Sequence, residues 1–163
     1  MPDLLVQALI SAALGLLLTA AWNDLSARRI PNWIAAALAG VAGVRLALAG
    51  DPAAAALALA IAAAAFAALA LAFAFGSVGG GDVKLLTATL LLAGPAGAPT
   101  LLTVTALAGG AMATVALLPA LRIPLDRLTG HRFARPGLPY GVAIAAGGGL
   151  ALVQQMPPAV GQG

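Results

Sequence analysis

Long apolar runs separated by short polar breaks dominate the chain. The runs cover residues 4–22, 33–49, 53–75, 85–98, 101–121 and about 139–156. A membrane-spanning helix needs about 20 such residues, and the first three runs are near that length. Only 8% of the residues are charged, against about 25% in a typical soluble domain, so the polar surface is too small for a water-soluble globule. The sequence therefore predicts an all-α, polytopic membrane helix bundle with about six transmembrane helices.

The fourth run, 85–98, is short and is interrupted by Gly94-Pro95. At about 1.5 Å per residue it reaches about 21 Å, less than the roughly 30 Å of a bilayer core. We expect this segment to be short, kinked or partly re-entrant. The length of the chain is compatible with one domain, so residues 1–163 are predicted to form a single integral-membrane domain with a short polar tail at 154–163.

The basic residues predict the orientation of this bundle. Seven of the eight Lys and Arg residues fall in the breaks 23–32, 76–84 and 119–138. Because positively charged loops stay in the cytoplasm, these breaks are expected inside and the N-terminus outside. Arg45 and Asp51 then belong to the outer face. Asp126, which has arginines around it in the third break, is expected to form a solvated ion pair.

Asp24 follows the first apolar run and Asp82 follows the third, so both are expected at the same cytoplasmic edge. The chain has only five acidic residues, and carboxylates at a membrane are costly enough to be functional candidates. Two neighbouring carboxylates can share a proton, so that the neutral acid polarises a peptide carbonyl while the ionised one activates a water. This pattern indicates aspartic-peptidase chemistry and leaves open which aspartate plays which role.

Three glycines, Gly79, Gly80 and Gly81, directly precede Asp82. Without side chains, this backbone can adopt positive φ and approach a bound peptide closely. An extended substrate could then pair with it as an added strand. Taken alone, the glycines favour the simpler interpretation of a flexible turn between helices. A phosphate-binding loop is disfavoured because no Gly-Lys-Ser/Thr sequence follows.

Two segments carry a family resemblance. Residues 24–32, Asp-Leu-Ser-Ala-Arg-Arg-Ile-Pro-Asn, resemble the first-aspartate motif of the type IV prepilin peptidases, and residues 79–84, Gly-Gly-Gly-Asp-Val-Lys, resemble their GxGD motif. Pro139-Tyr140-Gly141 resembles a stretch near the last helix of the short members. The resemblance covers about residues 5–153.

The resemblance implies a membrane aspartic endopeptidase that removes the basic leader of prepilins or pseudopilins at the cytoplasmic face of the bacterial inner membrane. It implies Asp24 and Asp82 as the catalytic pair and Gly79 and Gly81 as motif glycines. The remaining candidates for contacting the substrate are Gly80, Lys84 and Asn32.

The chain contains no cysteine and lacks the long cytoplasmic insertion of the larger, methylating members. It therefore resembles the short peptidase-only form of Flp/Tad pilus systems, and no N-methyltransferase activity is expected. The expected partners are the pilin substrate and membrane lipid. No metal, cofactor or nucleic acid is expected.

Some interpretations remain open. Asn32 fits either a hydrogen bond near the aspartates or a helix cap, and Lys84 fits either stabilisation of the anionic pair or a simple marker of the cytoplasmic face. Asp24 and Asp82 could instead form the ion site of a small transporter, although such sites are expected near the membrane midplane. A catalytically idle assembly factor is a third hypothesis. The sequence does not indicate the pilin or the oligomeric state.

Overall fold

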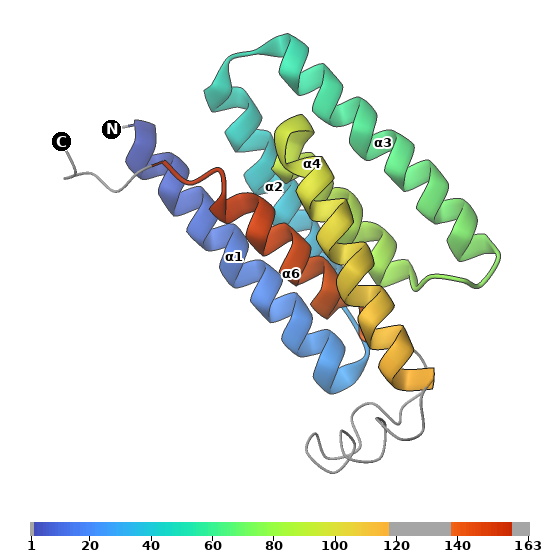
Figure 1. Ribbon diagram of the computed structural model, residues 1–163. Helices are drawn as coiled ribbons and strands as arrows, with labels where there is room; N and C mark the ends of the chain where they lie inside the picture. The colour runs from blue at the N-terminus through green and yellow to red at the C-terminus, as the bar shows by residue number, and fades with distance from the viewer. Residues whose placement is uncertain (1, 118–137, 158–163) are drawn as a thin grey trace.

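The computed structural model describes residues 2–117 and 138–157, and every regular element in these two ranges is an α-helix. The elements are α1 (Pro2–Ala27), α2 (Asn32–Ala49), α3 (Pro52–Ala74), α4 (Gly80–Leu117) and α6 (Tyr140–Val153). Figure 1 shows them packed side by side as one bundle. The predicted all-α class is confirmed.

Four of these helices, α1 to α4, are long and apolar enough to cross a membrane, and α6 is apolar but shorter. The prediction of about six spans is not confirmed. The fourth run and the described part of the fifth, residues 101–117, both lie within α4, which contains a non-helical residue at Gly94. Residues 118–137, which include Asp126 and four of the arginines expected inside, lie outside the described residues.

The chain reverses direction within α4, at Gly94. This residue has φ 62° and ψ −173°, a conformation that favours glycine. Pro95 follows and has no amide hydrogen to continue the helix. Residues 80–93 and 95–117 therefore run antiparallel as two arms (Figure 1). The predicted interruption at Gly94-Pro95 is confirmed, in the form of a reversal.

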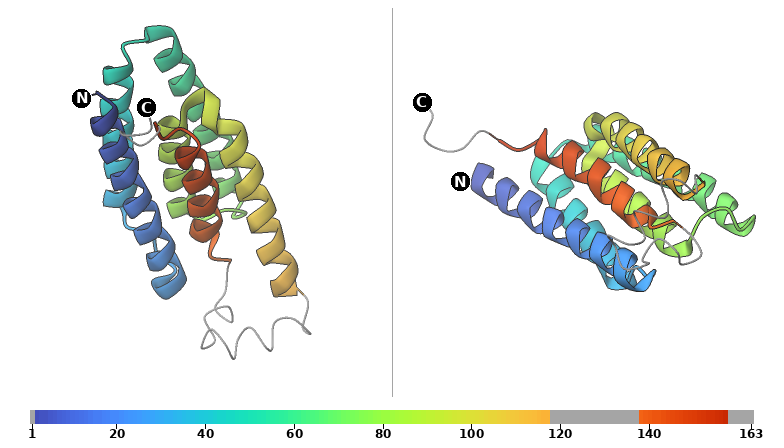
Figure 2. Two further views of the ribbon diagram at one scale, coloured as in Figure 1. Left: turned by 60° about the vertical axis from the view of Figure 1, so that its left-hand side comes forward. Right: turned by 60° about the horizontal axis from the view of Figure 1, so that its bottom comes forward.

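Helix α6 lies between α1 and the second arm of α4, as both views in Figure 2 show. Its glycines allow close contact: the side chains of Thr89 and Leu101, one from each arm of α4, lie against Gly148. Small residues let helix backbones approach one another in this way in lipid. Large buried side chains fill the rest of the core; among them are Ile10, Leu17, Ile34, Leu38, Leu85 and Ile144.

The bundle has two distinct ends. The aspartate end contains the last turn of α1, the segment 75–79 and the start of α6, while the opposite end contains the start of α1, the turn between α2 and α3, and Gly94 (Figure 1). Arg28, Arg29 and Lys84 belong to the aspartate end and Arg45 to the opposite one. This distribution follows the predicted charge asymmetry, and the orientation in a membrane stays a prediction.

Candidate active site

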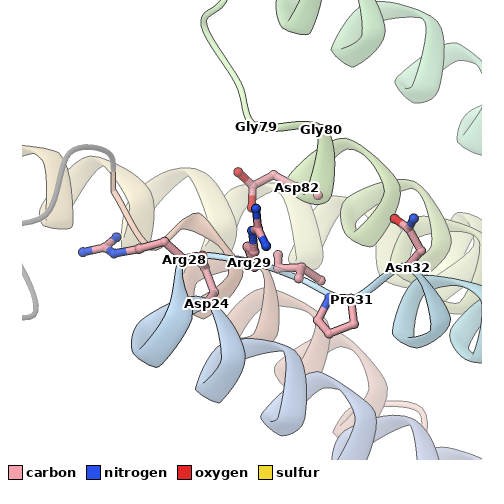
Figure 3. Close-up of a pocket in the computed structure, with 10 residues that line it drawn as sticks. Asp24, Arg28, Arg29, Pro31, Asn32, Gly79, Gly80 and Asp82 are labelled. Atoms are coloured by element: carbon pink, nitrogen blue, oxygen red, sulfur yellow. The ribbon is translucent and has the colours of Figure 1, made fainter.

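Asp24 and Asp82 line the same cavity at the aspartate end (Figure 3). Asp24 comes from the last turn of α1 and Asp82 from the first turn of α4. The cavity has a volume of about 480 Å³ and is also lined by residues 28–32 and 79–81. Both aspartates line an adjoining cavity of about 400 Å³ as well, together with residues 76–79, Leu138 and Tyr140. The fold thus brings together the two side chains that the sequence singled out, and their catalytic role stays a prediction.

Asp24 is held by a helix from the far end of the chain. Its side chain is buried, with 7% of its surface exposed, and the backbone N–H of Gly141 donates a hydrogen bond of 2.7 Å to its Oδ2. Gly141 is the second residue of α6. The first N–H groups of a helix have no partner within it and attract negative charge. The start of α6 therefore orients the Asp24 carboxylate.

Asp82 has a related environment on its own helix. It is half-buried and is the third residue of α4. The backbone N–H of Gly79, just before the helix, donates a hydrogen bond to its carboxylate. Each aspartate therefore accepts from a backbone N–H at a helix N-terminus while it lines an open cavity. The two carboxylates interact electrostatically across this space.

The segment between α1 and α2 lines the cavity together with the two aspartates. Arg28 has φ 53°, an uncommon conformation for a residue with a side chain and one that concentrates at functional sites. It lines both cavities. The side chain of Ile30 lies against both Gly81 and Gly141. Ile30 thus connects the N-termini of the two helices that orient the carboxylates.

The three glycines before Asp82 make room for other side chains. A Cβ atom at Gly79 would lie 2.8 Å from the Asp82 Oδ2. A Cβ at Gly81 would lie 3.2 Å from the Cβ of Ile30, and one at Gly80 would lie 3.3 Å from the Phe73 ring. A side chain at any of the three positions would therefore have to displace a neighbouring side chain.

Gly79, Gly80 and Gly81 do not have positive φ, so the expectation of positive φ is wrong, while pairing of this backbone with an extended substrate stays a prediction. Gly80 and Gly81 already belong to α4, so their backbone follows the helix. Among the described residues, the positive φ nearest to Asp82 in sequence belongs to Gly76, at 72°. That glycine lines the second cavity.

Lys84 and Asn32 contact each other. The Lys84 Nζ donates a hydrogen bond of 3.0 Å to the Asn32 Oδ1, and both side chains are exposed. Asn32 lines the first aspartate cavity, whereas Lys84 lines a neighbouring apolar pocket. Asn32 is the first residue of α2, and its oxygen faces Lys84 instead of capping the helix. The first interpretation of Asn32, a hydrogen bond close to the aspartates, fits the structure better.

Gly141 is missing from the site residues that the sequence predicted. A Cβ atom there would lie 2.9 Å from the Asp24 Oδ2 and 3.1 Å from the Ile30 Cδ1, so only glycine allows the approach. The sequence feature that could have indicated Gly141 is the stretch Pro139-Tyr140-Gly141. The contact itself joins residues 117 positions apart, which local sequence patterns cannot indicate.

The arrangement is suited to acid–base chemistry. Two carboxylates beside one open cavity can together withdraw a proton from a water and donate one to a bound carbonyl group. Within residues 2–117 and 138–157, no cluster of three or more His, Cys, Asp or Glu side chains is placed to hold a metal ion.

Comparison with known proteins gives a family. The model of the type IV leader peptidase family matches residues 11–114. This range includes both aspartates, Asn32 and the three glycines before Asp82, and it ends before α6. No curated protein and no solved structure matches the chain. Since the family model covers more than half of the sequence, the chain belongs to the type IV leader peptidase family.

Proposed function

We propose that this protein is a membrane aspartic endopeptidase that removes the basic leader of prepilins or pseudopilins at the cytoplasmic membrane face, with Asp24 and Asp82 as its catalytic pair. One observation carries the proposal. Both carboxylates, from helices that are distant in sequence, line one open cavity in a member of a leader peptidase family.

The geometry supports a mechanism without a covalent intermediate. One carboxyl group is neutral and donates a hydrogen bond to the scissile carbonyl, while the ionised one takes a proton from water. The resulting hydroxide attacks the carbonyl carbon, and the tetrahedral intermediate collapses as a proton passes to the leaving amine. The backbone N–H groups of Gly141 and Gly79 keep the carboxylates oriented throughout. The pair acts as a unit, so neither role is assigned to one residue.

The substrate assignment is tested by co-expression with prepilins encoded in the same genome, with leader loss measured by mass spectrometry. We expect cleavage at one bond, and none with the Asp82→Asn variant at equal membrane levels. We expect no methylation of the new N-terminus, because the chain resembles the short members of the family. If the unmodified protein cleaves none of these prepilins, the transporter hypothesis becomes the better explanation of the two aspartates.

The orientation is tested with single cysteines, since the chain has none of its own. Ala27, at the aspartate end, and Ala53, at the opposite end, are both exposed. A cysteine at position 27 is expected to react only with a reagent supplied from the cytoplasm, and one at position 53 only with a reagent supplied from outside. The reverse labelling would contradict a cytoplasmic active site.

A further inference from the structure

An apolar groove lies beside the aspartate cavity, between α3 and α4. It has a volume of about 260 Å³ and is lined by Phe66, Ala70 and Phe73 of α3 and by Gly80, Val83 and Lys84 of α4. The three residues of α3 are spaced four and three apart, so they share one helix face. Helix α3 stands at the edge of the bundle and packs chiefly on α4 (Figures 1 and 2).

The groove adjoins the cavity that holds the aspartates. Gly80 lines both the groove and the 480 Å³ cavity, and it lies two residues before Asp82. From Gly80 the groove follows α3 toward Phe66, away from the aspartate end. Phe66 and Phe73 are seven positions apart, which corresponds to about 10 Å of helix. The groove thus begins at Gly80, beside the aspartate cavity, and extends into the apolar part of the bundle.

We propose that this groove binds the apolar helix of the substrate, which follows the cleaved bond. The inference rests on the proposed function. In a substrate with a polar leader and a membrane-embedded helix, the junction between the two lies at the membrane edge. With that junction at Asp24 and Asp82, the helix that follows runs into the groove. A face carrying anchors three and four residues apart is suited to an apolar helix.

A bound lipid chain is the alternative occupant. A lipid chain could occupy any apolar depression on the bundle. Its binding would not require the depression to share a lining residue with the aspartate cavity. The shared residue Gly80, over which the Phe73 ring lies, favours an occupant that must reach both places. A polypeptide whose two halves differ in polarity satisfies this requirement.

The first test compares two substrates: a complete prepilin, and a peptide that contains the leader and cleavage site but lacks the apolar helix. Ala70→Trp fills the groove, whereas Ala68→Trp places the same side chain on the opposite, exposed face of α3. Ala70→Trp is expected to lower kcat/KM for the complete prepilin about tenfold, mainly through KM, the scale of a lost apolar contact. The short peptide should be cleaved by both variants within about twofold of the parental rate.

Two results would overturn the proposal. Equal slowing of both substrates by Ala70→Trp would mean that the substitution distorts the active site. Equal behaviour of Ala70→Trp and Ala68→Trp on the complete prepilin would mean that the groove holds only lipid. If the unmodified protein cleaves neither substrate, it is the proposed function that fails, and the second test still decides the groove.

The second test needs no cleavage. Ala70→Cys is combined with Asp82→Asn and with prepilins that carry single cysteines along the apolar helix. Disulfides are expected at substrate positions three or four residues apart, on one face of that helix, and not with Ala68→Cys. Absence of crosslinking at position 70, in a variant that inserts normally, would contradict the proposal whatever the catalytic result.

Discussion

The main polar groups at the two ends of the bundle have different surroundings. At the aspartate end, side-chain carboxylates accept hydrogen bonds from the backbone and line cavities of about 480 and 400 Å³. At the opposite end, two polar side chains, Arg45 and Gln155, donate to backbone carbonyl groups. Arg45 donates to the carbonyl oxygen of Leu92 at 3.0 Å and to the side-chain oxygen of Gln155, and Gln155 donates to the carbonyl oxygen of Ala93 at 3.0 Å.

The chain reversal at Gly94 explains the arrangement at the opposite end. Carbonyl groups at the end of a helix have no N–H partner within it, and in lipid each unpaired group costs several kcal/mol. Arg45 and Gln155 supply the missing donors beside a pocket of about 160 Å³. Polar side chains there are satisfied within the protein, whereas the two aspartates remain next to open space. The comparison indicates a structural role for Arg45 and Gln155 and agrees with the proposed catalytic role of the two aspartates.

The largest expected effect is at the aspartate end. Asp24→Asn and Asp82→Asn are each predicted to lower the cleavage rate by about 10³-fold or more, because neither carboxyl group suffices alone. The double variant should be little worse than either single one, since the pair acts as a unit. Cleavage time courses on matched amounts of purified protein measure this. Near-parental activity of either single variant would contradict a catalytic role for the two aspartates.

The next effect tests how Asp24 is oriented. Gly141→Ala is predicted to reduce the cleavage rate about a hundredfold, because the added Cβ would displace the carboxylate and errors of about 1 Å are costly. Gly149→Ala on the same helix is the matched control, since a Cβ there meets only the Leu14 Cδ2, at 3.8 Å.

The loss in Gly141→Ala should appear in kcat more than in KM, and the melting temperature should change less than the rate. Equal rates for Gly141→Ala and Gly149→Ala would show that the start of α6 does not position Asp24.

At the opposite end, Arg45→Met is predicted to lower the free energy of unfolding by about 1–3 kcal/mol, the cost of leaving a buried carbonyl unpaired. The specific activity of the folded protein should stay within about twofold, because the substitution lies far from the aspartates. Thermal melting in detergent and cleavage assays on the same sample measure both quantities. A large loss of specific activity without loss of stability would mean that the two ends are coupled.

The smallest effect concerns Asp51, which caps α3 by accepting hydrogen bonds of 3.0 Å from the N–H groups of Ala53 and Ala54. Asp51→Ala is predicted to destabilise the protein by about 1 kcal/mol, as for other helix caps. Asp51→Asn keeps the capping oxygen and should be close to parental in the same melting experiment. If both substitutions destabilise the protein equally, the charge of Asp51, and not its capping hydrogen bonds, stabilises the protein at this position.

Much of the site was visible in the sequence because its signals are local. Asp24 and Asp82 each lie within a few residues of the end of an apolar run, and the motifs around them extend over only a few residues. The glycines before Asp82 were also visible in the sequence, but their structural role was not. Positive φ was a reasonable expectation for consecutive glycines, and only the neighbours Phe73 and Ile30 reveal that close packing is the reason for them.

By itself, the sequence determined that this protein is an all-helical membrane protein, where its apolar segments lie, and which two carboxylates to consider. These properties depend on residue type and spacing along the chain. The tertiary structure decided that the chain reverses at Gly94, that Gly141 orients Asp24, and that Lys84 faces Asn32 beside an apolar groove. These features depend on how helices distant in sequence pack together, because a hydrogen bond or a close glycine contact is set by the partner helix and not by the residues next to it.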